Sequence, residues 1–595
     1  MAGGEGLQSV AMGGKTGPIT GRPVVYSTEG VISSGHYLTS MAGARMLLGG
    51  GNAFDAVAAA CFAAAVIEPI ASYSLAAEGV FMLYDAESDE TLSLSGQGVA
   101  PRKATVEFYR SQGLDAIPTG PQAHLAFTVP GIVDALIAML DRYGTKTVGE
   151  VLEPSMRYAE QGIPFYEYMV ERLEPPVARE QFERYPPGGT DVFYPNGGPP
   201  RPGSMLVQTA LGGTLRAMAD AESSASGDRA AGLRAARDAF YEGGIARTIV
   251  EGSRSVGGIL EMEDLAGYRA RFDRPVGTSY RGYEVHGHST WTQGPVLLQA
   301  LNILESFDLK AMGHNSPAYI HTLAEAIKLA MADRQAYYGD PEYADVPLDR
   351  LLSKAYAAER AKRIDPNRAW PETPPPGLFE NRADGGASVA ATTTTAGGDS
   401  GDEGGTTHIS AIDRHGNMAC ATPSGGDFGK SVFLPDLGCT LSTRSEMFNL
   451  DEGHPNVVEP GKRPRTTLVN YIVSKDGRPQ WTIGCPGGDH QAQANLQLIL
   501  NTLLFGMNPQ EAIEAPRFAT DSVVNSFYPH VYFPGQLSVE PGIPSRTVDA
   551  LKGLGHEVVA SVTCGMGATV SHRDPDTGVL STGGDPRRAC YAIGL

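Results

Sequence analysis

Positive charge, tryptophan and long apolar runs are scarce in this sequence. It contains 47 Lys and Arg residues against 67 Asp and Glu residues, and 3 Trp residues, with a formal net charge of −20. A surface this acidic does not attract nucleic acid or anionic membranes, so we expect neither as a partner. The apolar run 56–67 is too short to span a membrane. The first residues, MAGGEGLQSVAMGGKTG, lack the apolar h-region of a signal peptide, and we therefore expect a cytoplasmic protein.

Cysteine is also scarce, and its pattern indicates no metal site. The sequence has 6 cysteines, which are Cys61, Cys420, Cys439, Cys485, Cys564 and Cys590. No two of them form a CxxC pair, and no Cys/His cluster has ligand spacing. We expect free, buried thiols. We expect neither a metal nor another cofactor, since no cofactor signature is visible.

The composition and periodicity predict a large globular protein with both helices and strands. The chain is 42% hydrophobic and 19% charged, which is typical of soluble globular proteins. Helical periodicity is expected over 36–48, 55–67, 233–251 and 316–338, and a hairpin over 80–95. Residues 173–228 carry the poorest pattern and predict a loop-rich excursion. Helices and strands occur in both halves, so we expect an α+β fold with two β-layers covered by helices.

Two segments predict no packed structure. Residues 1–20 are expected to form a disordered leader. After Pro366 the composition changes to Pro and then to Thr and Gly, and we expect a linker over about 370–405.

The pattern changes abruptly at Thr406. The segment before it is rich in Gly, Asp and Ser, whereas residues 406–412 alternate like a strand and are followed by a turn and the apolar run 418–421. If the Gly405–Thr406 bond is cut, the Thr406 hydroxyl is a nucleophile and its own α-amine, titrating near pH ~8, is the base. Gly405 would let the backbone bend for this attack. The alternative is a flexible linker that runs into an ordinary hairpin.

Several motifs in order resemble the γ-glutamyltransferase family of N-terminal-nucleophile (Ntn) hydrolases. The resemblance covers nearly everything from about Tyr26 to the end. The motifs include Gly50–Ala56, Val129-Pro130-Gly131, Thr406–Ser410, Lys462-Arg463-Pro464, Gly484–Gly488 and Asp585-Pro586-Arg587. The resemblance implies a four-layer αββα sandwich and an autoprocessed heterodimer, with a large subunit 21–405 and a small catalytic subunit 406–595. It is compatible with a homodimer of such heterodimers.

The resemblance also implies roles for individual residues. Thr406 would be the nucleophile, and Ser424 would steady its amine. Gly487 and Gly488 would form the oxyanion hole, because two glycines before a helix present unobstructed amide N–H groups. The hydroxyls of Thr466 and Thr467 would contact the substrate and the intermediate.

The pocket departs from the family pattern. Gln97 stands where the family has the arginine that binds the substrate's α-carboxylate. Met447, Arg444 and Gly426 stand where the family holds the α-ammonium group, although Glu446 restores an acidic residue if the alignment shifts by one position. A substrate ammonium buried beside Arg444 should be strongly unfavourable. An anionic acyl group would instead pair with its guanidinium.

Three hypotheses follow. The first is an autoprocessing amidohydrolase or acyltransferase that acts on a small-molecule amide with a non-glutamyl anionic acyl group, which is oxamate-, glutaryl- or oxalyl-like. The second is a conventional γ-glutamyl hydrolase or transpeptidase acting on glutathione, anchored by Glu446 and by Arg102 or Arg444. The third is a non-processed, inactive scaffold.

Overall fold

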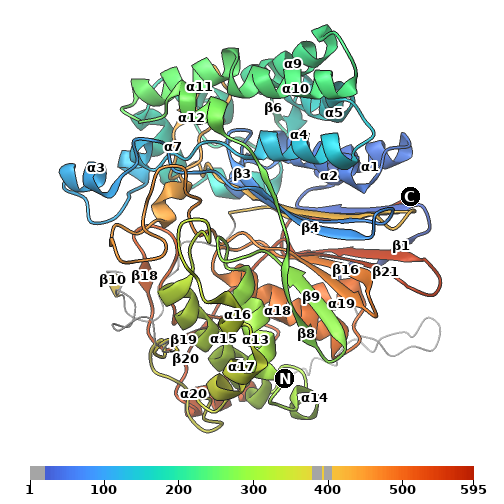
Figure 1. Ribbon diagram of the computed structural model, residues 1–595, viewed down its shortest axis with the longest axis vertical. Helices are drawn as coiled ribbons and strands as arrows, with labels where there is room; N and C mark the ends of the chain where they lie inside the picture. Colours follow the sequence, from blue (N-terminus) through green and yellow to red (C-terminus); the bar gives the residue numbers. More distant parts are fainter. Residues whose placement is uncertain (1–19, 378–391, 394–404) are drawn as a thin grey trace, which may run out of the picture.

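The computed structural model describes residues 20–377, 392–393 and 405–595 (Figure 1). The expected leader, apart from Thr20, and most of the expected linker lie outside these residues. Two seven-stranded sheets form the centre of the described part, and neighbouring strands in both are antiparallel. The first sheet has the order β23 (Tyr591–Gly594), β2 (Gly30–Ser34), β11 (Ile409–Asp413), β12 (Met418–Ser424), β3 (Glu78–Asp85), β4 (Glu90–Gly96) and β7 (Arg271–Asp273). The second has the order β1 (Val25–Ser27), β22 (Leu580–Gly584), β21 (Thr569–Arg573), β16 (Arg478–Gly484), β15 (Tyr471–Lys475), β9 (Tyr283–Gly287) and β8 (Val276–Tyr280).

Helices cover the outer face of each sheet, which gives four layers (Figure 1). Over the first sheet lie α1 (Tyr37–Leu48), α2 (Ala53–Ile67), α4 (Ile132–Tyr143), α5 (Val148–Gln161), α9 (Thr209–Ser224), α10 (Arg229–Tyr241), α11 (Gly244–Ser255) and α12 (Met262–Gly267). Over the second lie α13 (Gly294–Leu304), α15 (Pro317–Tyr337), α16 (Leu348–Leu351), α17 (Lys354–Ala361), α18 (His490–Leu503), α19 (Pro509–Glu514) and α20 (Ser545–Gly553). The expected αββα sandwich is confirmed.

The shorter elements surround these layers. The helical ones are η1 (Pro69–Ala71), α3 (Val106–Ser111), η2 (Gly120–Leu125), α6 (Glu167–Leu173), α7 (Pro176–Arg184), α8 (Thr190–Phe193), α14 (Leu309–Met312) and η3 (Arg444–Met447). The strands are β5 (Ile163–Pro164), β6 (Met205–Leu206), β10 (Thr392–Thr393), β13 (Phe433–Leu434), β14 (Cys439–Thr440), β17 (Phe518–Thr520), β18 (Val531–Tyr532), β19 (Gln536–Val539) and β20 (Glu557–Ala560).

The sequence explains the position of α2 on the outer face of the first sheet. Asn52 caps its N-terminus in a capping box with Asp55, and every residue of the helix is buried. Its many alanines allow close approach to α1, where a Cβ on Gly43 would come within 2.7 Å of the Ala56 carbonyl oxygen. The Asp413 carboxylate, at the turn of the β11–β12 hairpin, accepts from the Ala53 N–H at 3.0 Å. The helix therefore anchors the hairpin that follows Thr406.

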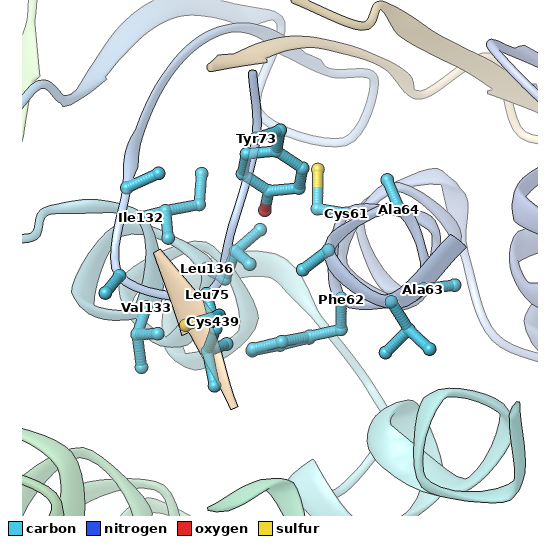
Figure 2. Packing of buried hydrophobic residues seen from close by; sticks show 14 of the residues in the cluster. Cys61, Phe62, Ala63, Ala64, Tyr73, Leu75, Ile132, Val133, Leu136 and Cys439 are labelled. Atoms are coloured by element: carbon cyan, nitrogen blue, oxygen red, sulfur yellow. The ribbon is translucent and has the colours of Figure 1, made fainter. Parts of the chain in front are cut away.

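The core next to α2 also fixes the segment that leads into β3. Figure 2 shows Tyr73 and Leu75 between Cys61 and Phe62 of α2 on one side and Ile132, Val133 and Leu136 of α4 on the other. Tyr73 is 1% exposed and Leu75 is 0% exposed. This packing holds the preceding residue, Ser72, in a left-handed conformation with φ +51°.

Both sheets contain strands from both sides of Gly405. In the first sheet, β11 pairs with β2 and β12 pairs with β3. In the second, β15 pairs with β9 and β22 pairs with β1. Leu595 also lies against β1, since the Ser27 hydroxyl donates to its main-chain oxygen at 2.6 Å. A cut after Gly405 would therefore leave two fragments that share one core.

Two expectations about helices were wrong. The segment 233–251 forms two helices, α10 and α11, because the chain turns at Glu242-Gly243 and Gly243 has non-helical dihedrals. The excursion 173–228 contains α7 and the long helix α9. The many prolines of this segment suggested loops. One of them, Pro176, instead begins α7, where its missing N–H costs nothing.

Candidate active site

Thr406 lies three residues before β11, in a strained conformation. Its φ is +86°, which a β-branched residue rarely adopts outside functional sites. Its hydroxyl donates to the Ser424 hydroxyl at 3.0 Å, and its N–H donates to the Ala71 carbonyl oxygen. The antiparallel hairpin explains the first contact, because Ser424 ends β12 where β11 begins. Regular pairing starts only at Ile409, so the strand is shorter than expected at its start.

Thr406 opens onto a small cavity. The structure brings six of the predicted site residues to this cavity, namely Gly405, Thr406, Ser424, Gly426, Arg444 and Glu446. The other lining residues are Ser72, Arg172, Gly425, Asp427, Lys430, Thr443 and Phe527.

Arg444 is buried and already paired at this cavity. Its Nε–H donates to Glu78 Oε1 at 2.7 Å, and Glu78 Oε2 accepts from the Ser442 hydroxyl at 2.7 Å. The guanidinium carbon lies 5.6 Å from the centre of the Phe527 ring, and Lys430 Nζ lies 5.1 Å from the same ring. Arg172 of α6 adds a third cation to the lining. Two of these cations, Arg444 and Lys430, thus lie around one aromatic side chain of the cavity.

Two carboxylates lie at the same cavity. Glu446 accepts from the Tyr528 N–H at 3.1 Å, and burial raises the pKa of its carboxyl, against the opposing effect of Lys430 and Arg444. Asp427 accepts from the Ser72 hydroxyl at 2.7 Å. The lining is therefore mixed in charge rather than purely cationic.

Gly487 and Gly488 follow β16 and precede α18. Both have positive φ, +122° and +46°, so a side chain at either position would be strained. Among the described residues, neither amide N–H donates a hydrogen bond. Neither glycine lines the Thr406 cavity; Gly487 lines a different small pocket with His490 and Asp521, whose Nε2 and Oδ1 are 2.7 Å apart. The oxyanion role stays a prediction.

Four other predicted residues do not line the Thr406 cavity, and their roles stay predictions. Gln97 is buried, and its side chain donates to the Gly98 carbonyl oxygen at 3.5 Å. Met447 lies behind Arg444, with its sulfur 3.9 Å from Arg444 Nη1. Thr466 and Thr467 are both buried, beside the loop that precedes α13.

Sequence reasoning missed several residues of the cavity. Asp427 and Lys430 lie close in sequence to Gly426, so the signal for them was proximity to a predicted site residue. Ser72 lies near none of the predicted site residues and gave no signal. Arg172 gave no signal, because it belongs to a helix next to the segment interpreted as loops.

One group of potential metal ligands occurs among the described residues, away from this cavity. His321, Glu325 and His556 place ligand atoms within 4.8 Å of one another. Lys328 Nζ already neutralises Glu325 at 2.9 Å, and His321 Nδ1 and His556 Nε2 form a hydrogen bond of 2.9 Å. The cluster is internally paired, so we assign no metal to it. In the part of the chain that is described, no helix has the length and apolarity needed to cross a membrane.

Comparisons with known proteins agree with this geometry. The Gamma-glutamyltranspeptidase family profile matches residues 39–595. The Glutathione hydrolase-like YwrD proenzyme of Bacillus subtilis (strain 168) is 33% identical over 574 residues, covering 96% of this chain and 99% of that protein. The Oxamate amidohydrolase proenzyme of Klebsiella pneumoniae subsp. pneumoniae is 31% identical over 578 residues, covering 96% of this chain and 99% of that protein. The crystal structure of cephalosporin acylase from Bacillus halodurans superposes with a TM-score of 0.82 at 29% identity, covering 99% of each chain. The chain therefore belongs to the γ-glutamyltranspeptidase family and is an enzyme of its Ntn-type hydrolase and acyltransferase class.

Proposed function

We propose that this chain cleaves itself between Gly405 and Thr406 and then hydrolyses or transfers an anionic acyl group through an ester on Thr406. The observation that carries this proposal is the Thr406 hydroxyl, held 3.0 Å from Ser424 at a cavity lined by Arg172, Lys430 and Arg444. The resemblance of the whole chain to proteins named proenzymes supports the self-cleavage.

Self-cleavage uses the strained backbone conformation of Thr406. The Thr406 hydroxyl attacks the Gly405 carbonyl carbon, the C–N bond breaks, and the acyl chain moves from nitrogen to oxygen while the hydroxyl proton passes to the released Thr406 amine. Water then hydrolyses this ester, which gives fragments 1–405 and 406–595. Release of the φ +86° conformation favours the shift. The fragments stay together because they share both sheets.

Turnover repeats this chemistry on a substrate. The Thr406 hydroxyl attacks the amide carbonyl, the new α-amine takes the hydroxyl proton and passes it to the leaving amine, and water or an acceptor amine opens the ester. The amides of Gly487 and Gly488 would stabilise the oxyanion.

Charge favours a carboxylate-bearing acyl group such as an oxamate-, glutaryl- or oxalyl-like one. The Glu78 contact neutralises part of the Arg444 charge, so Lys430 and Arg172 share the binding of the substrate carboxylate in this proposal. A relative named for oxamate hydrolysis supports this class. Glu446 favours the second candidate, a γ-glutamyl acyl group, because its carboxylate lies at the same cavity and would pair with an α-ammonium group.

The first experiment is intact-mass analysis of the wild type beside Thr406→Ala. We expect two fragments split before Thr406 in the wild type and one uncut chain in the variant. Glutaryl, oxalyl and γ-glutamyl 4-nitroanilides then separate the two candidates. A wild type that stays uncut would overturn the proposal and would favour the inactive scaffold.

A further inference from the structure

Arg588 contacts Thr406 from the loop between β22 and β23. Its Nη1 donates to the Thr406 carbonyl oxygen at 2.5 Å, and its Nη2 donates to Glu68 Oε2 at 3.1 Å. The side chains of Arg588 and Glu68 are each 1% exposed. The contacted carbonyl belongs to the Thr406–Thr407 peptide and not to the bond that is cut. Arg588 therefore does not act as an oxyanion donor in self-cleavage.

Glu68 links this arginine to the residue after the nucleophile. Its Oε2 also accepts from the Thr407 hydroxyl at 2.9 Å, and its Oε1 accepts from the Thr39 hydroxyl at 2.7 Å. Gly35 leaves the room for this arrangement, because a Cβ there would overlap both Glu68 Oε2 and Thr407 Oγ1. One buried carboxylate thus binds α1, the Thr407 side chain and the loop between β22 and β23 together.

We propose that Arg588, held by Glu68, is a positioning residue that fixes the Thr406–Thr407 peptide and so aims the Thr406 hydroxyl. This inference rests on the proposed role of Thr406. Before the cut, covalent bonds on both sides restrain Thr406. After the cut, it is a chain end, and chain ends fray unless other contacts hold them. The Arg588 contact is present in the uncut chain, where it orients Thr406 for self-cleavage, and it survives the cut, where it holds the new chain end for turnover.

The adjacent arginine provides a matched control. Arg587 Nη2 donates to Glu540 Oε2 at 2.6 Å, and its Nη1 donates to Asp585 Oδ1 at 3.2 Å. Arg587 makes no contact with Thr406 among the described residues. Two neighbouring arginines of the same loop therefore serve different partners.

The test compares Arg588→Lys with Arg587→Lys. A lysine ammonium cannot reproduce the two-pronged contact to the Thr406 carbonyl and Glu68. We expect Arg588→Lys to mature ~10- to 100-fold more slowly by intact mass, since small misplacements of a reacting group cost this much. In the processed enzyme we expect kcat on glutaryl 4-nitroanilide to fall by a similar factor with KM unchanged. Arg587→Lys should mature at the wild-type rate.

A second variant guards against a folding defect. Glu68→Gln/Arg588→Met removes both buried charges together, and we expect it to melt like the wild type but to mature as slowly as Arg588→Lys. Wild-type maturation and kcat in both Arg588 variants would overturn this inference while the role of Thr406 stands. A wild type that never cuts would overturn the proposed function first, and this inference with it.

Discussion

The guanidinium of Arg444 and the carboxylate of Glu78 form a buried ion pair of 2.7 Å beside the proposed nucleophile. Glu78 is the first residue of β3, so the pair joins the first sheet to the segment that carries Arg444. It keeps a cation at the cavity and pairs that cation with a carboxylate.

Breaking this pair should cost much more stability than breaking an exposed one. We expect Glu78→Gln to lower the free energy of unfolding by ~3 kcal/mol, because Arg444 becomes an unpaired buried charge. Glu153→Gln, whose partner Arg45 is exposed, should cost less than ~1 kcal/mol. Urea unfolding of both variants in a Thr406→Ala background, where one chain persists, measures the difference. Equal costs would show that the Arg444 pair is solvated.

The positive and negative charges of the cavity should have opposite effects on the binding of an anionic acyl group. We expect Lys430→Met to raise KM for glutaryl 4-nitroanilide ~10- to 100-fold, which is the usual value of a charge-assisted hydrogen bond. Glu446→Gln should leave this KM unchanged or lower it, since it removes a negative charge near the substrate carboxylate. If Glu446→Gln instead abolishes activity on γ-glutamyl 4-nitroanilide while Lys430→Met does not affect the glutaryl compound, the γ-glutamyl candidate is correct.

Buried histidines predict acid sensitivity. Burial lowers the pKa of His408 to about 3, against ~6.5 in an unfolded chain. Between these values the unfolded state binds a proton that the folded state does not, so stability falls as the pH drops below ~6.5. Between pH 7 and pH 5, we expect the free energy of unfolding of His408→Gln to fall by ~2 kcal/mol less than that of its parent. Urea unfolding in the Thr406→Ala background measures this, with His415→Gln on the exposed hairpin turn as the control. Identical pH slopes in the two variants would contradict the prediction.

The sequence predicted elements best where local signals and burial agree. The all-apolar run that became α2 and the hairpin around Asp413–Asn417 were both found, because period and turn residues define them. The sequence did not predict the break between α10 and α11 at Glu242-Gly243. A single glycine in a helical pattern indicates a less stable helix, not a change in the direction of the chain. The boundaries of β11 depended on pairing with β2, which the sequence does not show.

The residues of the site also fall into those that the sequence predicted and those that it did not. Thr406, Ser424, Arg444 and Glu446 were placed by motif order. Arg172 could not be predicted, because α6 reaches the cavity only through tertiary packing. The Glu78 pairing was equally invisible, since its partner lies far along the chain.

The neighbouring positions of Ser27 and Leu595 have a consequence for protein engineering. A circular permutant that begins with Met followed by Thr406, and that joins Leu595 to the start of β1 through a short linker, would keep every strand in place. Removal of the initiator methionine would expose the Thr406 amine directly. In such a chain the N-terminal Thr406 would form without self-cleavage, so that the turnover of substrate could be measured separately from maturation.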